Sequence, residues 1–147
     1  MSLPIRILIA DNDTNFSETL GRLLDEQPGM TVIDLVRDGQ GAVNSCRQAW
    51  PDVVLIDLHL PVLDSVRAIQ LILAHNERIK ILGLISSPND KYAVEAIKAG
   101  ASGCLDKHKG IRNGTIVKAI QQVADGDVLL NPALANSILQ EFHRLSE

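Results

Sequence analysis

The chain has few aromatic residues and only two cysteines, and these scarcities exclude several classes of protein. Phe, Tyr and Trp make up 3% of its 147 residues, too few for a surface on which nucleic-acid bases stack. Cys46 and Cys104 lie far apart and outside any metal-binding or redox spacing, which predicts two reduced, packed thiols. The sequence therefore favours a protein that folds without disulfides or a structural metal.

Long apolar runs and clusters of positive charge are also missing. No apolar run approaches the ~20 residues that cross a bilayer, and the N-terminus lacks a signal peptide. The net charge is -4 with Lys and Arg dispersed along the chain, so no basic stripe follows a phosphate backbone. We therefore expect a soluble, cytoplasmic protein that contacts neither a membrane nor DNA directly.

Five short apolar runs alternate with amphipathic segments of helical length. The runs span residues 5–10, 30–36, 53–57, 80–84 and 103–105. Such alternation predicts βαβ units and a mostly parallel sheet. The expected helices span roughly 15–27, 40–49 and 64–75, followed by a fourth that ends at Gly100 and a fifth that ends near Gly126. Asp13 or Asn15 is expected to cap the first helix, and Asp64 the third.

A further amphipathic helix is predicted at the C-terminus. Asn131 followed by Pro132 supplies a cap and a proline at the first helical position. Leu134, Ile138, Leu139 and Phe142 give this helix an apolar face. The helix either packs on the preceding α/β domain or connects it to something beyond Glu147.

Acidic residues stand at the ends of two predicted strands. Asp11-Asn12-Asp13 follows the first run, and Asp57 ends the third. Ligands of open parallel sheets bind in the crevice outside the carboxyl ends of the strands, so Asp11 and Asp57 are expected to converge there. Converging acids repel each other unless a cation joins them. Mg²⁺, which prefers carboxylate and carbonyl oxygens completed by water, is the obvious candidate.

These acids, the turn Leu60-Pro61-Val62-Leu63-Asp64 and Lys107 after the fifth strand resemble the receiver domain of bacterial two-component response regulators. Segments 94–103 and 129–135 are similar to the LuxR/NarL type, in which a linker helix and a helix-turn-helix domain follow the receiver. The resemblance implies a flavodoxin-like (βα)5 parallel sheet of order 2-1-3-4-5 with an additional C-terminal helix. It also implies a receiver over 4–126 and a linker helix over 127–147 that leads to an output domain absent from this sequence.

The resemblance assigns a role to each residue that matches the family motif. Asp57 would accept a phosphoryl group from a sensor histidine kinase and form an acyl phosphate. Asp11 would hold Mg²⁺ directly or through water, and the backbone carbonyl of His59 would be a further ligand. Lys107 would pair with a phosphoryl oxygen. The chain would then be a signalling module rather than an enzyme, able to form a homodimer and to control its own DNA-binding output domain.

Several positions depart from the family pattern. Asn12 stands where the family has a second acid, so it can ligate Mg²⁺ only weakly. Ile85 replaces a Thr or Ser that bonds the phosphoryl group, and Ser86 substitutes for it only if the loop slips by one residue. Cys104 replaces the switch aromatic, and Ser65 replaces a glycine. Of these departures, Asn12 predicts weak Mg²⁺ binding, and Asn12, Ile85 and Cys104 together predict a weakened phosphorylation switch.

Two other functions are compatible with the same residues. Asn12 and Ile85 favour a receiver-like interaction domain that works without phosphate, whereas Asp57 and Lys107 argue against it. The sequence Asp-Asn-Asp-Thr at 11–14 also resembles the Asp-x-Asp of haloacid-dehalogenase-type phosphatases. The fifth residue of that motif does not match, and the chain is short for that fold with its cap.

Overall fold

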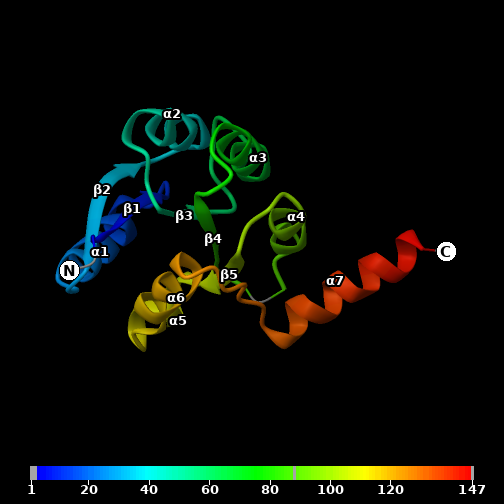
Figure 1. Cartoon of the computed structure of the whole chain (residues 1–147). Coiled ribbons are helices and arrows are strands. Elements are labelled where there is room, and N and C mark those ends of the chain that lie inside the picture. Colours follow the sequence, from blue (N-terminus) through cyan, green and yellow to red (C-terminus); the bar gives the residue numbers. More distant parts are fainter. Residues whose placement is uncertain (1–2, 88, 147) are drawn as a thin grey trace.

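The computed structural model describes residues 3–87 and 89–146 and contains a five-stranded sheet with helices on both faces (Figure 1). The strands are β1 (Ile5–Ala10), β2 (Met30–Val36), β3 (Val53–Asp57), β4 (Lys80–Ile85) and β5 (Gly103–Asp106). Their order is β2-β1-β3-β4-β5, and every neighbouring pair is parallel. This is the flavodoxin-like order that the resemblance implies, so the predicted fold is confirmed.

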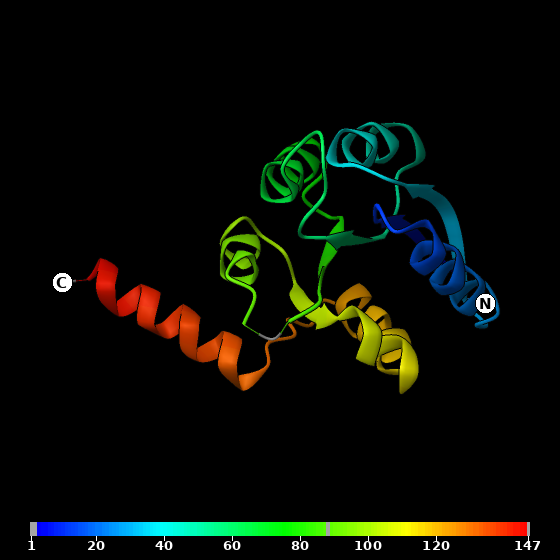
Figure 2. The same cartoon turned by 180° about the vertical axis from the view of Figure 1, so that it is seen from behind.

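Helices follow the strands in chain order and cover both faces of the sheet, as the opposite view shows (Figure 2). They are α1 (Thr14–Asp25), α2 (Gly39–Ala49), α3 (Ser65–His75), α4 (Tyr92–Lys98), α5 (Lys107–Arg112), α6 (Thr115–Ala124) and α7 (Pro132–Leu145). The buried side chains of α1 and α6 pack on one face of the sheet. Those of α2, α3 and α4 pack on the other.

The central strands are mostly apolar because both of their faces are buried. Along β1, Ile7 and Ile9 belong to the core beneath α1 and α6. Leu8 and Ala10 belong to the core beneath α2, α3 and α4. Side chains alternate between the faces of a strand, so a strand covered on both sides reads as one unbroken apolar run. This packing fixes the carboxyl ends of β1 and β3, where the acidic residues follow.

Side chains that the sequence singled out cap the first, third and C-terminal helices. Asp13 Oδ1 accepts a hydrogen bond from the Phe16 amide at 3.1 Å, and Asp64 Oδ2 accepts one from the Arg67 amide at 3.1 Å. Asn131 Oδ1 accepts from the amide of Leu134 at 2.7 Å, with proline in the first turn. Each bond satisfies an amide that lacks a partner within its helix. The cap of the first helix is thus Asp13 and not Asn15.

Helix α5 was not expected from the sequence. Residues 107–112 include a glycine and show no apolar periodicity. The helix begins because Asp106 Oδ1 accepts hydrogen bonds from the amides of His108 and Lys109, at 3.0 and 2.9 Å. Gly114, with a φ of 72°, separates it from α6. The consequence for the site is that Lys107 stands at the first residue of a helix rather than in an open loop.

Val62 has a strained backbone in the loop between β3 and α3. Its φ is 72°, and the Leu63 amide donates across it to the Pro61 carbonyl at 2.8 Å. This three-residue turn with a positive φ is rare and strained, especially for a β-branched residue. The side chain is 81% exposed, so burial does not offset the strain.

Replacing Val62 with glycine is expected to raise the free energy of unfolding by about 1 kcal/mol. Glycine adopts a positive φ without steric cost, and this gain exceeds the added entropy of the unfolded chain. Urea denaturation measures the change. Val128→Gly is the matched control, because this 63% exposed valine does not have a positive φ. The control is expected to be no more stable than the wild type, and equal responses at the two valines would contradict the prediction.

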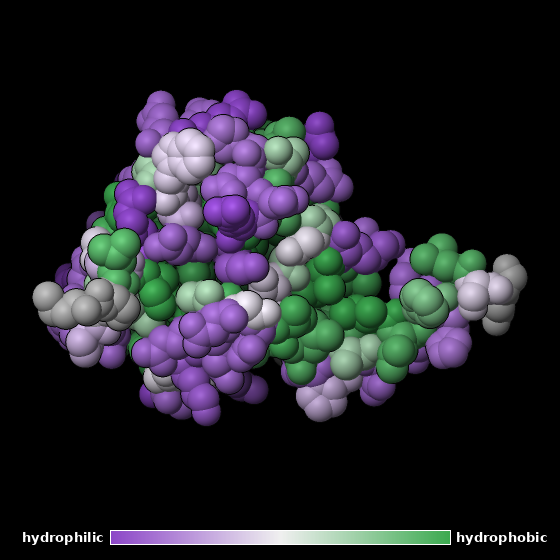
Figure 3. Space-filling model, in the orientation of Figure 1, coloured by the Kyte–Doolittle hydropathy of each residue, from purple (hydrophilic) through white to green (hydrophobic). Residues whose placement is uncertain are grey.

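Helix α7 packs on α4 through one face and leaves another exposed. Leu134 is buried against the core, Ile138 packs beside it, and Lys98 Nζ lies 3.4 Å from Glu141 Oε1. Leu139, Phe142 and Leu145 remain exposed, and apolar surface is visible along the projecting helix in Figure 3. None of the helices in the described ranges is both long and apolar enough to cross a membrane.

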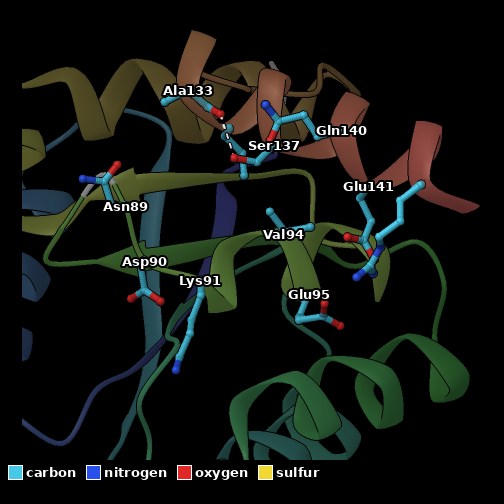
Figure 4. A pocket seen from close by; sticks show the side chains of 11 residues that line it. Asn89, Asp90, Lys91, Val94, Glu95, Ala133, Ser137, Gln140 and Glu141 are labelled. Atoms are coloured by element: carbon cyan, nitrogen blue, oxygen red, sulfur yellow. Dashed lines mark hydrogen bonds and ion pairs between the residues drawn. The ribbon is translucent and has the colours of Figure 1, made fainter.

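A groove of about 510 Å³ lies between α4 and α7 (Figure 4). Asp90 and Lys91 line it from the loop before α4, and Ser137 and Gln140 line it from α7. Its walls are mostly polar and carry charges of both signs. The acidic residues that the sequence singled out lie elsewhere, at the carboxyl ends of β1 and β3.

Candidate functional site

The structure brings Asp11, Asp57 and Lys107 together at one edge of the sheet. Asp11 directly follows β1, Asp57 ends the neighbouring β3, and Lys107 directly follows β5. Lys107 Nζ donates to Asp11 Oδ2 at 2.9 Å and to Asp57 Oδ2 at 2.8 Å. One ammonium group therefore joins two carboxylates that are 46 positions apart in the sequence but adjacent in the sheet.

Backbone amides hold the other oxygen of each carboxylate. Asp11 Oδ1 accepts from the Asp13 amide at 2.9 Å, and Asp57 Oδ1 accepts from the His59 amide at 2.7 Å. The Lys107 ammonium also lies 4.6 Å from the centre of the Phe16 ring, a favourable cation–π distance. These contacts fix the orientation of all three charged groups before any ligand arrives.

Burial and hydrogen bonding shift the pKa values of Asp11 and Lys107. Burial raises the pKa of Asp11 above the usual aspartate value, and the hydrogen bonds from Lys107 and the Asp13 amide offset this only in part. Burial would lower the pKa of Lys107, but its hydrogen bonds to Asp57 and Asp11 outweigh burial and hold the pKa above the ordinary lysine value. Lys107 thus stays protonated at neutral pH. With both acids ionised, the cluster carries one net negative charge and favours a further cation.

The raised pKa of Asp11 predicts how stability changes with pH when no Mg²⁺ is present. The folded state binds this proton more tightly than the unfolded state does. Its contribution to stability is therefore fully present below pH 3.8 and is lost as the pH rises through the folded pKa. We expect Asp11→Asn to gain stability relative to the wild type as the pH rises from below 3.8 to neutrality. Denaturation in urea at several pH values measures this difference.

The control for this prediction is Asn12→Ala, which changes an exposed, neutral neighbour of Asp11. Its stability relative to the wild type is expected to be constant over the same pH range. The lost contact with Lys107 lowers the stability of Asp11→Asn, but Lys107 stays protonated throughout this range. A difference between Asp11→Asn and the wild type that does not vary with pH would contradict the prediction.

The residues of the cluster fit a hard divalent cation. Two carboxylates from adjacent strands supply charged oxygens, which Mg²⁺ prefers, and the carbonyl of His59 is available in the turn after Asp57. Within residues 3–87 and 89–146, no group of three or more His, Cys, Asp or Glu side chains is arranged to hold a metal. Mg²⁺ bound here would take its remaining ligands from carbonyl oxygens and water. Asn12 is exposed and adds no charge.

The other predicted switch positions lie outside the charged cluster. Ile85 and Cys104 are buried in the core beneath α2, α3 and α4. The Cys104 thiol lies 4.0 Å from the Ala93 carbonyl, and burial, with the nearby charge of Asp90, raises its pKa to about 12. Cys104 is therefore a packing residue of the core. Ser86 is exposed directly after β4.

Two sets of contacts at the site were not anticipated from the sequence. His59 Nε2 lies 2.6 Å from Asp90 Oδ2, and the His59 ring meets the Tyr92 ring edge-on at 4.8 Å, so the loops after β3 and β4 are joined. Ser65 Oγ donates to the Asp57 carbonyl at 2.7 Å. No local pattern predicts a pairing between residues 59 and 90. For Ser65, the only signal was its departure from the glycine of the family motif.

The chain is similar to known response regulators and transcriptional regulatory proteins. The family model for the response regulator receiver domain matches residues 7–121. The transcriptional regulatory protein LnrK of Bacillus subtilis (strain 168) is 34% identical over 140 residues, which cover 95% of this chain and 63% of LnrK. DegU of Brevibacillus brevis is 29% identical over 141 residues, which cover 96% and 59%. The chain thus spans about three fifths of the length of these curated relatives.

Solved structures show the same fold. A LuxR-family two-component response regulator from Aurantimonas sp. SI85-9A1 matches with a TM-score of 0.78 and 27% identity, over 94% of this chain and 97% of that one. The signal receiver domain of the putative response regulator NarL from Mycobacterium tuberculosis also has a TM-score of 0.78, at 24% identity over 85% of this chain and 99% of that one. This chain belongs to the family of response regulator receiver domains and is related to LuxR-type transcriptional regulators.

Proposed function

We propose that this chain is the phosphoacceptor domain of a two-component response regulator and that Asp57 takes a phosphoryl group from a sensor histidine kinase. The observation that supports this proposal most strongly is the buried ammonium of Lys107, which lies within 2.9 Å of a carboxylate oxygen of both Asp11 and Asp57. A buried lysine paired with two acids is poised to balance the charge of an incoming phosphoryl group.

Asp11 and Asp57 differ in exposure, and this difference suggests a separate role for each. The side chain of Asp57 is 14% exposed and that of Asp11 is 2% exposed, so Asp57 is the carboxylate that a phosphodonor can reach. Asp57 would act as the nucleophile, while Asp11 and the His59 carbonyl would help to hold Mg²⁺. Bound Mg²⁺ supplies charge stabilisation for the phosphoryl oxygens. Lys107, held protonated, would pair with one of those oxygens after the transfer.

The same proposal includes a weakened switch. Asn12 contributes no charge to the metal site, so Mg²⁺ binds less tightly than it would beside a third acid. Ile85 and Cys104 are packed in an apolar core, and an isoleucine cannot donate a hydrogen bond to a phosphoryl group. The loop after β4 is instead joined to the loop after β3 through His59 and Asp90.

Beryllofluoride, a mimic of the phosphoryl group, separates this proposal from a receiver-like interaction domain that works without phosphate. For a weakened switch, Mg²⁺ and beryllofluoride should shift the amide resonances around Asp57 and Lys107 and leave those of α4 nearly unchanged. Ile85→Thr should extend the shifts into α4 because it supplies the missing hydroxyl. An interaction domain without a phosphoryl site would show no shifts around Lys107 in either protein. Large shifts throughout α4 in the wild type would contradict the weakened switch.

The names of the relatives support a proposal for the output and partners of this chain. LnrK and DegU are transcriptional regulatory proteins, so the chain would control transcription through a helix-turn-helix domain, with 4–126 as the receiver and 127–147 as the linker. Movement of α4 would reach α7 through the packing of Ile138 and the ion pair between Lys98 and Glu141. A homodimer and a cytoplasmic location are part of the same proposal. Light scattering with and without beryllofluoride tests whether modification controls dimerisation.

A further inference from the structure

Ser65 is a buried polar residue that the proposed reaction does not use. It is 1% exposed and stands at the first residue of α3. Its hydroxyl donates to the Asp57 carbonyl at 2.7 Å and accepts a hydrogen bond from the Leu60 amide at 3.1 Å. A single side chain therefore satisfies one backbone group at each end of the turn formed by residues 57–60.

This turn carries the groups at which the proposed chemistry occurs. Asp57 is the proposed acceptor, and the carbonyl of His59 is a proposed Mg²⁺ ligand. The His59 amide donates to Asp57 Oδ1 at 2.7 Å, so the orientation of the carboxylate depends on the conformation of the turn. A change at either end of the turn would alter the relation between the carboxylate and the His59 carbonyl.

Ser65 is itself held firmly in place. The capping bond from the Arg67 amide to Asp64 fixes the start of α3, and Ala68, Ile69 and Ile72 anchor this helix in the core. Glycine, which the family motif has at this position, would have no side chain to bond the Asp57 carbonyl or the Leu60 amide. In this chain the turn is therefore fixed by a hydroxyl group.

We infer that Ser65 is a positioning residue that holds the 57–60 turn in the arrangement required for Mg²⁺ binding, an inference that rests on the proposed function. Groups that orient metal ligands through hydrogen bonds are typically worth about 10- to 100-fold in metal affinity. Here the effect acts through the backbone, because Ser65 bonds the Asp57 carbonyl and the Leu60 amide rather than a ligating side chain.

The test compares Mg²⁺ binding by the wild type, Ser65→Ala and Ser65→Gly in the absence of a phosphodonor. Titration followed through amide resonances gives the Kd, and hydrogen exchange reports the protection of the Leu60 amide. Both variants remove the hydroxyl, so a failure of one to fold leaves the other. We expect the Kd for Mg²⁺ to rise about tenfold or more and the Leu60 amide to exchange faster.

Ser45→Ala is the matched control. Ser45 is 7% exposed, lies in α2, and donates to Asp34 Oδ2 at 2.7 Å. Its replacement also removes a hydrogen bond of a buried serine and should lower stability, but it should leave the Kd for Mg²⁺ unchanged. A purely structural role of Ser65 would lower stability in the same way without moving the Kd.

The outcomes distinguish this inference from the function on which it rests. Wild-type protein that binds Mg²⁺, together with Ser65 variants that bind it equally well, would overturn the role of Ser65 alone. Wild-type protein that does not bind Mg²⁺ would overturn both. Weakened binding in the Ser65 variants, with normal binding in Ser45→Ala, supports the positioning role.

Discussion

Replacing Lys107 with methionine is expected to destabilise the protein by about 3 kcal/mol at about pH 8 without Mg²⁺, because it leaves one buried and one partly buried carboxylate without their shared cation. Both ion pairs are largely shielded from water, with side chains that are 8% exposed for Lys107 and at most 14% for the acids. Methionine preserves most of the volume, so the loss reports the charge rather than a cavity. Urea denaturation measures it.

The destabilisation of Lys107→Met should shrink under two conditions. At acidic pH it should be smaller, because burial already raises the pKa of Asp11 and loss of the ammonium raises it further, so Asp11 takes up a proton more readily. Saturating Mg²⁺ should also reduce it, since the metal supplies the missing positive charge. Lys118→Met is the control, because it removes an exposed lysine from α6 and should change stability by less than about 0.5 kcal/mol. A Lys107→Met variant as stable as the wild type at the higher pH would contradict the account.

Replacing Asn12 with aspartate, the kind of acid that the family pattern has at this position, is expected to tighten Mg²⁺ binding by about tenfold. One more unit charge at about 4 Å from a cation is worth on the order of 1–4 kcal/mol at the effective dielectrics of a protein surface. Without metal, Asn12→Asp should be less stable than the wild type at neutral pH, because a third carboxylate joins a cluster that already carries a net negative charge. Added Mg²⁺ should reverse that loss.

Asn44→Asp is the control for this substitution. Asn44 is exposed on α2, where the same change of charge does not alter the charged cluster. Calorimetric titration with Mg²⁺ should give the wild-type Kd for Asn44→Asp and a lower Kd for Asn12→Asp. Equal affinities in all three proteins would show that residue 12 does not influence the metal site.

The elements of the fold that depend on burial were predictable from the sequence, and those that depend on local capping were less so. The central strands β1, β3 and β4 followed from apolar runs, because strands covered on both faces leave few polar positions. Helix α5 was missed because its six residues show no apolar period, and the Asp106 cap that begins it is a short signal. The first helix ends at Asp25, two residues earlier than expected, where the chain turns toward Gly29.

The charged cluster could be anticipated because acids at the ends of parallel strands must lie at the same edge of the sheet. The contacts around it could not. His59 and Asp90 are 31 positions apart, and their pairing depends on how two loops lie after folding. The role of Ser65 depends on the conformation of the 57–60 turn. No periodic pattern in the sequence predicts that conformation.

Intact-mass measurement during incubation with Mg²⁺ and a small phosphodonor tests the proposed acceptor most directly. Wild-type protein is expected to gain the mass of one phosphoryl group slowly, whereas Asp57→Asn gains none. Removal of Mg²⁺ should abolish the gain, and Lys107→Met should reduce it. Equal modification of the wild type and Asp57→Asn, or no modification of the wild type at saturating Mg²⁺, would contradict the assignment of Asp57 as the phosphoacceptor.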